Sequence, residues 1–165
     1  MKISVMGYAG SGKTYLSVYL AEKLSLPILN LDEVKFDKDW KPYENEVVLP
    51  RVEEFLGNES WIIDGNYTYF CYNERLSSSD IIILLLLPRV SCFISAIKRR
   101  KEREAQGYKN DINPWFVWFL LFGGRKRKAR LRYDSIVEKY ADKVIVLRSR
   151  KQINEFINNY EVVTK

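Results

Sequence analysis

The chain contains no histidine and only two cysteines among its 165 residues. Without histidine, the commonest general base and the commonest transition-metal ligand are both missing, so acid–base chemistry must fall to carboxylates. Cys71 and Cys92 fit no metal-ligand spacing, which excludes a cysteine-based zinc site. We expect both cysteines to be free thiols.

Long hydrophobic runs, a secretory signal and internal repeats are also missing. The apolar run at 81–97 is interrupted by Pro88 and Arg89, and the run at 115–122 is far shorter than a spanning helix, which needs about 20 residues. No long apolar segment with a small-residue cleavage site follows Met1. The sequence therefore predicts a cytoplasmic protein without a membrane span, folded as a single domain over 1–165.

Short apolar runs alternate with helix-like stretches along the chain. Strands are expected at 2–6, 27–32, 61–65, 81–87 and 143–148, with a helix at 13–25. The run IIILLLL at 81–87 is apolar at every position, as in strands that helices cover on both faces. We therefore expect a three-layer α/β/α sandwich around five parallel strands. Ligands of such sheets bind at the carboxyl ends of the strands, which brings together Gly7, Asp32, Asp64 and Pro88.

A glycine loop, GYAGSGKT at 7–14, satisfies the pattern G-x-x-x-x-G-K-[ST], with an apolar strand before it and a helix after it. Glycines let successive backbone N–H groups point into one concavity, to which the following helix adds its positive end. Such a loop wraps polyphosphate: Lys13 would reach the β- and γ-phosphates, and the Thr14 hydroxyl would coordinate Mg²⁺. The alternative is a glycine-rich turn with an exposed lysine. The predicted ATP-binding residues are Gly7, Tyr8, Ala9, Gly10, Ser11, Gly12, Lys13, Thr14 and Tyr15.

Two carboxylates follow apolar strands, Asp32 at the end of ILNLD and Asp64 at the end of WIID. A single carboxylate at a strand end commonly caps a helix or a turn. Two of them beside a phosphate loop can divide the work of phosphoryl transfer, because the reaction needs a metal near the phosphates and a positioned acceptor hydroxyl.

Four stretches together resemble a bacterial group related to adenylate kinase and called DNA topology modulation proteins. These are GYAGSGKT, LPILNLDEVKFDKDWKP, WIIDGNY with Arg75 after it, and DIIILLLLPRVSCFISAIKRR. The resemblance covers residues 1–103 well and is weaker over NPWFVWFLLFGGRKRKAR. It implies the nucleoside monophosphate kinase-like P-loop fold, with a mobile substrate-binding insert after the second strand and an arginine-bearing lid after the fourth. The segments 33–58 and 99–132 fall at those two places.

The same resemblance implies roles for Asp64 and Asp32, and position in the sequence suggests roles for Arg75, before the fourth strand, and for Trp40, in the first insert. Asp64 would lie near metal and substrate and form the metal site with Thr14, and Asp32 would orient or deprotonate the acceptor hydroxyl. Arg75 would bind an acceptor phosphate or another substrate anion, with an ordinary surface position as the alternative. Trp40 would form a wall for a substrate base or ring, or belong to a packing cluster under a long loop. The predicted substrate-binding residues are Asp32, Trp40, Asp64, Asn66 and Arg75.

Basic residues gather in the second half of the chain, within a formal net charge of +6. Arg99 and Arg103 are four residues apart and share a helical face. In a lid they would neutralise charge on the transferred phosphoryl group, which makes them candidate catalytic residues with Lys13 and Asp32. The alternative for both arginines is a solvated charged helix.

The run GGRKRKARLR at 123–132 follows the aromatic run PWFVWFLLF and suits contact with a nucleic acid. We favour a different interpretation, in which Trp115, Phe119 and Phe122 mark a buried helical face. The arginines of the run, Arg125, Arg127 and Arg130, then belong to the lid or to a solvated helix.

The sequence thus predicts an ATP- and Mg²⁺-dependent kinase that phosphorylates a small acceptor, with a nucleotide or nucleoside as candidates. The alternative is a nucleotide-binding protein that associates with nucleic acid and affects DNA topology. The first should respond to a small acceptor, and the second to DNA or RNA with a steep salt dependence.

Overall fold

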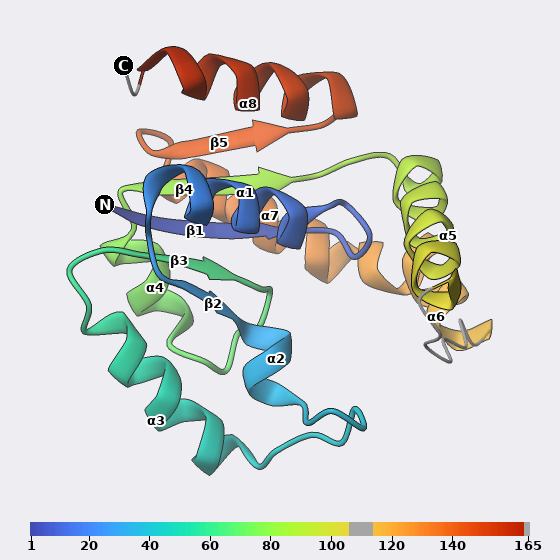
Figure 1. Cartoon of the computed structure of the whole chain (residues 1–165), viewed down its shortest axis with the longest axis horizontal. Helices are drawn as coiled ribbons and strands as arrows, with labels where there is room; N and C mark the ends of the chain where they lie inside the picture. The colour runs from blue at the N-terminus through green and yellow to red at the C-terminus, as the bar shows by residue number, and fades with distance from the viewer. Residues whose placement is uncertain (106–113, 164–165) are drawn as a thin grey trace. The chain divides into compact units, whose positions relative to one another are not determined.

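A computed structural model of the chain describes residues 1–105 and 114–163. Five strands, eight α-helices and one 3-10 helix follow one another in the described residues (Figure 1). In chain order they are β1 Lys2–Gly7, α1 Lys13–Leu24, β2 Ile28–Asn30, α2 Leu31–Lys35, α3 Asn45–Leu56, β3 Trp61–Asp64, α4 Tyr72–Ser78, β4 Ile81–Leu85, α5 Arg89–Ala105, α6 Pro114–Leu121, η1 Gly123–Arg125, α7 Arg127–Lys139, β5 Val144–Leu147 and α8 Arg150–Val163.

The five strands form one parallel sheet in the order β2-β3-β1-β4-β5. β3 lies between β1 and β2, and its last residue, Asp64, is opposite Val5 on one side and Asn30 on the other. The predicted α/β fold around five parallel strands is confirmed. Gly7 and Asp64 end their strands as predicted. The strand expected at 81–87 is shorter, because β4 ends at Leu85, and Pro88 lies directly before α5 instead of at the end of a strand.

The second strand is shorter than the sequence predicts, because the chain turns into α2 at Leu31. Asn30 has an extended backbone, and its side-chain oxygen accepts a hydrogen bond from the Asp32 N–H at 2.9 Å. Asn30 therefore caps α2 and ends the strand at the same time. The prediction that Asp32 ends a strand is wrong, since it lies in the first turn of this helix.

The chain divides into two compact units, each assembled from separate stretches. The first unit consists of Met1–Gly7, Lys13–Ile83 and Asp142–Ile145. The second consists of Tyr8–Gly12, Leu84–Ala141 and Val146–Lys165. The glycine loop thus has its two ends in the first unit and its middle in the second.

The first unit buries its apolar side chains on both sides of its strands. α1 packs against β1, β2 and β3, and α4 contacts β1 (Figure 1). A second cluster joins α2 and α3 to β3, and all its central members are 1% exposed or less: Leu31, Val48, Val52, Trp61, Ile63 and Phe70. Burial of this kind stabilises by about 25 cal/mol per Å² of apolar surface. The cluster holds the backbone that carries Asp32.

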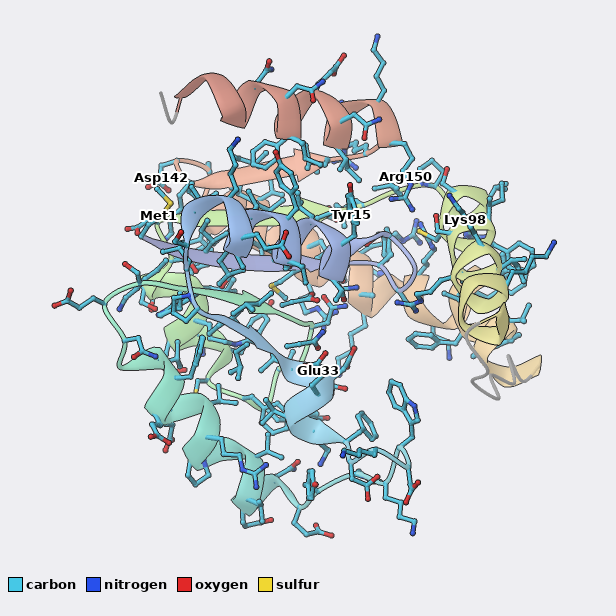
Figure 2. The ribbon with its side chains drawn as sticks, in the orientation of Figure 1. Met1, Tyr15, Glu33, Lys98, Asp142 and Arg150 are labelled. Atoms are coloured by element: carbon cyan, nitrogen blue, oxygen red, sulfur yellow. The ribbon has the colours of Figure 1, made fainter. Side chains whose placement is uncertain are left out.

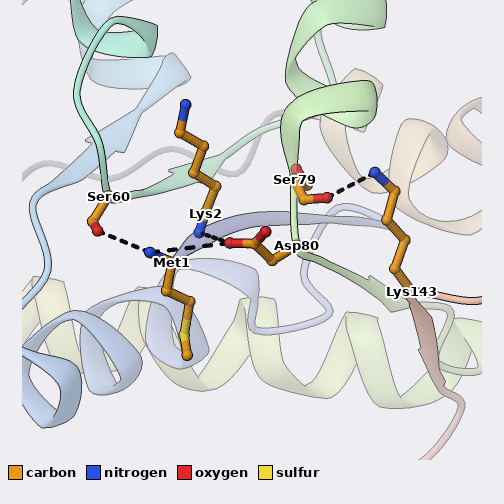
Figure 3. Close-up of polar contacts among 6 residues, drawn as sticks. All are labelled: Met1, Lys2, Ser60, Ser79, Asp80 and Lys143. Carbon is orange, nitrogen blue, oxygen red and sulfur yellow. Dashed lines mark hydrogen bonds and ion pairs between the residues drawn. The ribbon is translucent and has the colours of Figure 1, made fainter.

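Polar contacts close the amino-terminal end of the strands in the first unit (Figure 3). The Met1 α-amino group donates to Ser60 Oγ at 2.8 Å and lies 4.0 Å from Asp80 Oδ2. Lys143 Nζ donates to the Ser79 carbonyl oxygen at 2.7 Å. Residues from the beginning, middle and end of the chain are joined at this end of the sheet.

Helix α6 of the second unit corrects one sequence interpretation. Leu120 is buried, with 2% of its surface exposed, whereas Phe122 is 52% exposed. The prediction that Phe122 belongs to a buried helical face is wrong, because α6 ends at Leu121 and Phe122 has a non-helical backbone. Phe119 is partly buried, and the side chain of Trp115 lies outside the described residues.

Candidate functional site

The glycine loop follows β1 and leads directly into α1, as the sequence predicts. Gly7, Gly10 and Gly12 have φ values of 140°, 73° and 93°, a region that side chains rarely adopt. A Cβ atom on Gly10 would lie 2.6 Å from the Cys92 carbonyl oxygen, which leaves no room for a side chain. The backbone of this loop therefore depends on glycine for both its conformation and its packing.

In the first unit, Thr14 and Asp64 form a buried polar pair. Thr14 Oγ1 donates to Asp64 Oδ2 at 2.8 Å, and the Asp64 side chain is 2% exposed. Burial raises the pKa of Asp64, against the opposing effects of Lys13 and of the Thr14 hydrogen bond. The second oxygen, Oδ1, is buried and accepts no hydrogen bond in the described part of the chain.

This pair fits a magnesium ion that is held together with phosphates. Mg²⁺ prefers oxygen ligands and commonly takes one or two carboxylates, with substrate phosphates and water completing the octahedron. Asp64 Oδ1 and the Thr14 hydroxyl are such oxygens. Within residues 1–105 and 114–163, no group of three His, Cys, Asp or Glu side chains forms an all-protein metal cage. The predicted metal ligands Thr14 and Asp64 are thus brought together.

The second predicted carboxylate, Asp32, lies on the exposed first turn of α2. Its Oδ1 accepts a hydrogen bond from the Tyr67 hydroxyl at 2.7 Å. The charge of Asp32 raises the pKa of Asp64, so the two carboxylates interact electrostatically. Burial, followed by the contact with Asp32, raises the pKa of Tyr67, which therefore keeps its proton at physiological pH. Sequence reasoning did not single out Tyr67.

Asn66 holds the start of the glycine loop. Its Oδ1 accepts from the Gly7 N–H at 3.0 Å, and its Nδ2 donates to the Gly7 carbonyl oxygen at 2.6 Å. The side-chain amide thus mimics a strand partner for Gly7. The predicted substrate ligand is engaged with the loop backbone.

Arg75 is buried in α4, with 1% of its surface exposed, so the surface alternative is wrong. Its guanidinium donates to the carbonyl oxygens of Gly65 at 3.4 Å and Tyr67 at 2.5 Å. Burial lowers the pKa of Arg75 to about 10. Arg75 therefore supports the backbone that follows β3.

Two arginines of the second unit lie against the middle of the glycine loop. The Arg125 guanidinium carbon is 3.8 Å from the ring centre of Tyr8, and its Nη2 is 3.1 Å from Cys92 Sγ. Arg150, at the start of α8 (Figure 2), lies so close to Gly12 that a Cβ there would be 2.7 Å from its Nη1. Sequence reasoning left Arg125 between lid and solvent and missed Arg150. Its position just after the carboxyl end of β5 is the signal that would have found it.

Comparisons of sequence and of structure with known proteins both find shikimate kinases. No family model matches the chain. Shikimate kinase of Flavobacterium psychrophilum is 25% identical over an alignment of 157 residues, and the match covers 83% of this chain and 90% of that protein. The crystal structure of shikimate kinase from Bacteroides thetaiotaomicron has a TM-score of 0.54 at 18% identity and covers 99% of this chain and 98% of its own. Shikimate kinase from Acinetobacter baumannii, in complex with shikimate, has a TM-score of 0.57 at 18% identity, with coverages of 99% and 92%.

The chain has the fold of a P-loop kinase. The curated relative and these structures together indicate a P-loop kinase enzyme. The narrower likeness to DNA topology modulation proteins is not confirmed by them. In the described residues of this kinase fold, no helix is both long enough and apolar enough to cross a membrane.

The remaining predicted site residues lie in the two inserts. Trp40 is 63% exposed in the loop between α2 and α3, and its ring centre is 5.6 Å from that of Phe36. Arg99 is exposed on α5, and the side chain of Arg103 lies outside the described residues, as do residues 106–113. The catalytic roles of both arginines stay predictions.

Proposed function

We propose that the chain is an ATP- and Mg²⁺-dependent phosphotransferase that acts on a hydroxyl group of a small acceptor. One observation carries the proposal: the Thr14 hydroxyl, at the end of the glycine loop, donates a hydrogen bond to the buried Asp64 carboxylate, whose second oxygen has no hydrogen-bond partner among the described residues. The charge of Lys13 lowers the pKa of Asp64 and that of Asp32 raises it, so the four residues with the predicted roles lie within electrostatic range of one another in the first unit. The likeness to shikimate kinases supports the same activity.

Each residue of this group has a task in the proposed reaction. The glycine-loop N–H groups and Lys13 bind the β- and γ-phosphates. Thr14 and Asp64 hold Mg²⁺, which when bound neutralises charge on those phosphates. Asp32 accepts the proton of the acceptor hydroxyl while the acceptor oxygen bonds to the γ-phosphorus and the bond to the bridging oxygen breaks. The products are the phosphorylated acceptor, ADP and one proton.

The acceptor is defined by its hydroxyl group. Shikimate is a candidate, since a solved structure of the same fold is a complex with it. Nucleosides and nucleotides are candidates through the resemblance to proteins related to adenylate kinase. All of these present a hydroxyl that a carboxylate such as Asp32 can orient.

The test is ADP release from ATP and Mg²⁺ in the presence of shikimate, nucleosides, nucleoside monophosphates and small polyols. We expect one class of acceptor to raise the rate clearly above that without acceptor. Lys13→Ala should lower the stimulated rate about 100-fold or more, because a positioned charge at the transferring phosphate is lost. Lys23→Ala, in the last turn of the same helix, is the control. Failure of every acceptor, together with wild-type ATP affinity in Lys13→Ala, would contradict the proposal.

A second candidate function rests on the distribution of charge. The second unit contains eighteen Lys and Arg against seven Asp and Glu, whereas the first contains nine against fourteen. A basic unit of this kind favours a nucleic-acid-associated nucleotide-binding protein, in line with the resemblance to DNA topology modulation proteins. Its signature would be ATP hydrolysis stimulated by DNA or RNA and lost steeply with added salt, with no response to small acceptors.

A further inference from the structure

The four residues DGNY at 64–67 begin with the last residue of β3 and together contact three parts of the first unit: the start of α1, the start of the glycine loop and α2. Asp64 accepts from Thr14 at the start of α1, and Asn66 makes two hydrogen bonds with Gly7 at the start of the glycine loop. Tyr67 donates to Asp32 on α2. A single stretch of chain therefore connects the nucleotide side of the first unit to the carboxylate on the acceptor side.

Gly65 brings this stretch against α2. Its φ is 147°, and a Cβ there would lie 2.7 Å from Leu31 Cβ, which is closer than packed carbon atoms approach. The backbone of Gly65 consequently touches the first residue of α2. Asp32 is the next residue of that helix, and Tyr67 lies two residues after Gly65. The contact between Gly65 and Leu31 therefore limits the distance between the backbones of Asp32 and Tyr67.

Arg75 holds the backbone of residues 65–67 in place. It donates to the carbonyl oxygens of Gly65 and Tyr67 from within α4. The Tyr67 ring also packs on Phe70, with ring centres 5.3 Å apart. The tyrosine hydroxyl is thus presented by a backbone and a ring that are both held in place.

Asp32 has little else that orients its carboxylate. Its side chain is exposed on a helix of five residues, where an unrestrained aspartate samples several rotamers. Among the described residues, the one hydrogen bond that its carboxylate accepts comes from the Tyr67 hydroxyl and engages Oδ1. That contact fixes one rotamer and leaves Oδ2 to accept the proton of a hydroxyl.

We propose that Tyr67 is a positioning residue, which orients Asp32 for the acceptor hydroxyl and ties that orientation to the segment that holds the glycine loop. The proposal rests on the proposed function for the role of Asp32. It assigns to the tyrosine hydroxyl a contribution that the ring alone does not make, because a phenylalanine would keep the contact with Phe70. Misplacement of a reacting group by about 1 Å can lower a rate about 100-fold.

The first experiment compares Tyr67→Phe with Tyr69→Phe, a neighbouring tyrosine that is 74% exposed. With the acceptor found by ADP release, Tyr67→Phe should lower kcat about 10- to 100-fold. The KM for ATP should stay within about twofold, and the melting temperature within a few degrees. Tyr69→Phe should leave all three unchanged. A wild-type kcat in Tyr67→Phe, or a fall in kcat accompanied by an equal loss of ATP affinity and of thermal stability, would overturn the positioning role.

A double-mutant cycle separates this proposal from the proposed function. In kinase assays, Tyr67→Phe added to Asp32→Ala, which removes the acceptor oxygen of the contact, should lower kcat no further, since the tyrosine acts through that carboxylate. Additive losses would overturn it. The same cycle on unfolding of the ligand-free protein needs no acceptor, and an absence of coupling there would overturn the contact itself. If wild-type protein phosphorylates no acceptor while the unfolding cycle shows coupling, the proposed function fails, and the positioning role of Tyr67 in that reaction fails with it, whereas the contact with Asp32 stands.

Discussion

Asp64 is a carboxylate kept in an environment that disfavours its charge. Burial raises its pKa above the ordinary value of 3.8. A raised pKa in the folded chain means that ionisation destabilises the fold, from about the ordinary pKa upward, and the effect is complete above the raised value. Such a group is expected where its charge serves binding, which here is the proposed contact with Mg²⁺.

Asp64→Asn should therefore separate stability from function. At pH 7 the ligand-free variant should have a higher free energy of unfolding than wild type, by roughly 1.4 kcal/mol for each unit by which the pKa is raised. The difference should shrink as the pH falls toward 3.8, where the wild-type carboxylate also becomes neutral. Urea unfolding at several pH values measures this, and titration with Mg²⁺ should show weaker nucleotide binding. A lower free energy of unfolding of the variant at pH 7 would instead make Asp64 a structural residue. Asp39→Asn, at an exposed position, is the control and should leave the free energy of unfolding unchanged.

At the scale of single residues, the sequence predicted those whose type and local pattern indicate a chemical role. The glycine loop has a fixed pattern, and carboxylates stand out after apolar strands. Tyr67 carries no such local signal, and Arg150 carries only its position just after the carboxyl end of β5. Their contacts with Asp32 and with the loop at Gly12 join residues far apart in the chain, so only the folded chain reveals them.

Among the elements, the five-residue helix α2 depends most on its surroundings. An isolated helix of this length is unstable in water. α2 is held by the Asn30 cap, by burial of Leu31 and by the close approach of Gly65. The run ILNLD suggested a strand through Asp32 because these supports come from the side chain of Asn30 and from Gly65, which directly follows another strand, β3. The apolar pattern contains neither.

Gly65→Ala tests the element directly. The added methyl group has no space beside Leu31, and a φ of 147° strains any side chain, so we expect a loss of about 2 kcal/mol or more in stability. The added methyl group must displace α2, which carries Asp32. The rate of acceptor-dependent turnover should therefore fall by a larger factor than the affinity for ATP. Gly57→Ala, at a helical φ of −65° after α3, is the matched control. Urea unfolding and kinetics measure the two effects, and near-wild-type values in Gly65→Ala would refute the close approach.

At the scale of the whole molecule, the parallel sheet of five strands could be predicted because apolar runs and helical connections alternate regularly, whereas the strand order comes only from the structure. The residues at which helices and strands end could not be predicted, as the aromatic run PWFVWFLLF shows. Helical spacing through Phe122 predicted burial, yet α6 ends one residue earlier. The division into two units could not be read from the sequence either, since no linker separates them.

Hydrogen exchange across the whole chain tests the role of the two inserts. A kinase must keep water from the transferred phosphoryl group, and segments that order around bound ligands serve this purpose. With ATP and acceptor together, the segments 33–58, 99–105 and 123–132 should become better protected than in the free protein. Helix α6 should change less, because Leu120 is already buried. Equal protection in the free and bound states would favour a fixed surface for an extended polyanion.

The contacts of Lys143 bear on how the protein is made. Residues 142–145 belong to the first unit, although the stretch 84–141 of the second unit precedes them. Lys143 Nζ donates to the Ser79 carbonyl oxygen, and the Lys143 carbonyl oxygen accepts from the Ile82 N–H. A chain growing on the ribosome therefore leaves the edge of β4 and the end of α4 without these partners until residue 143 emerges. The first unit can thus complete its fold only after the intervening residues 84–141 of the second unit have been synthesised.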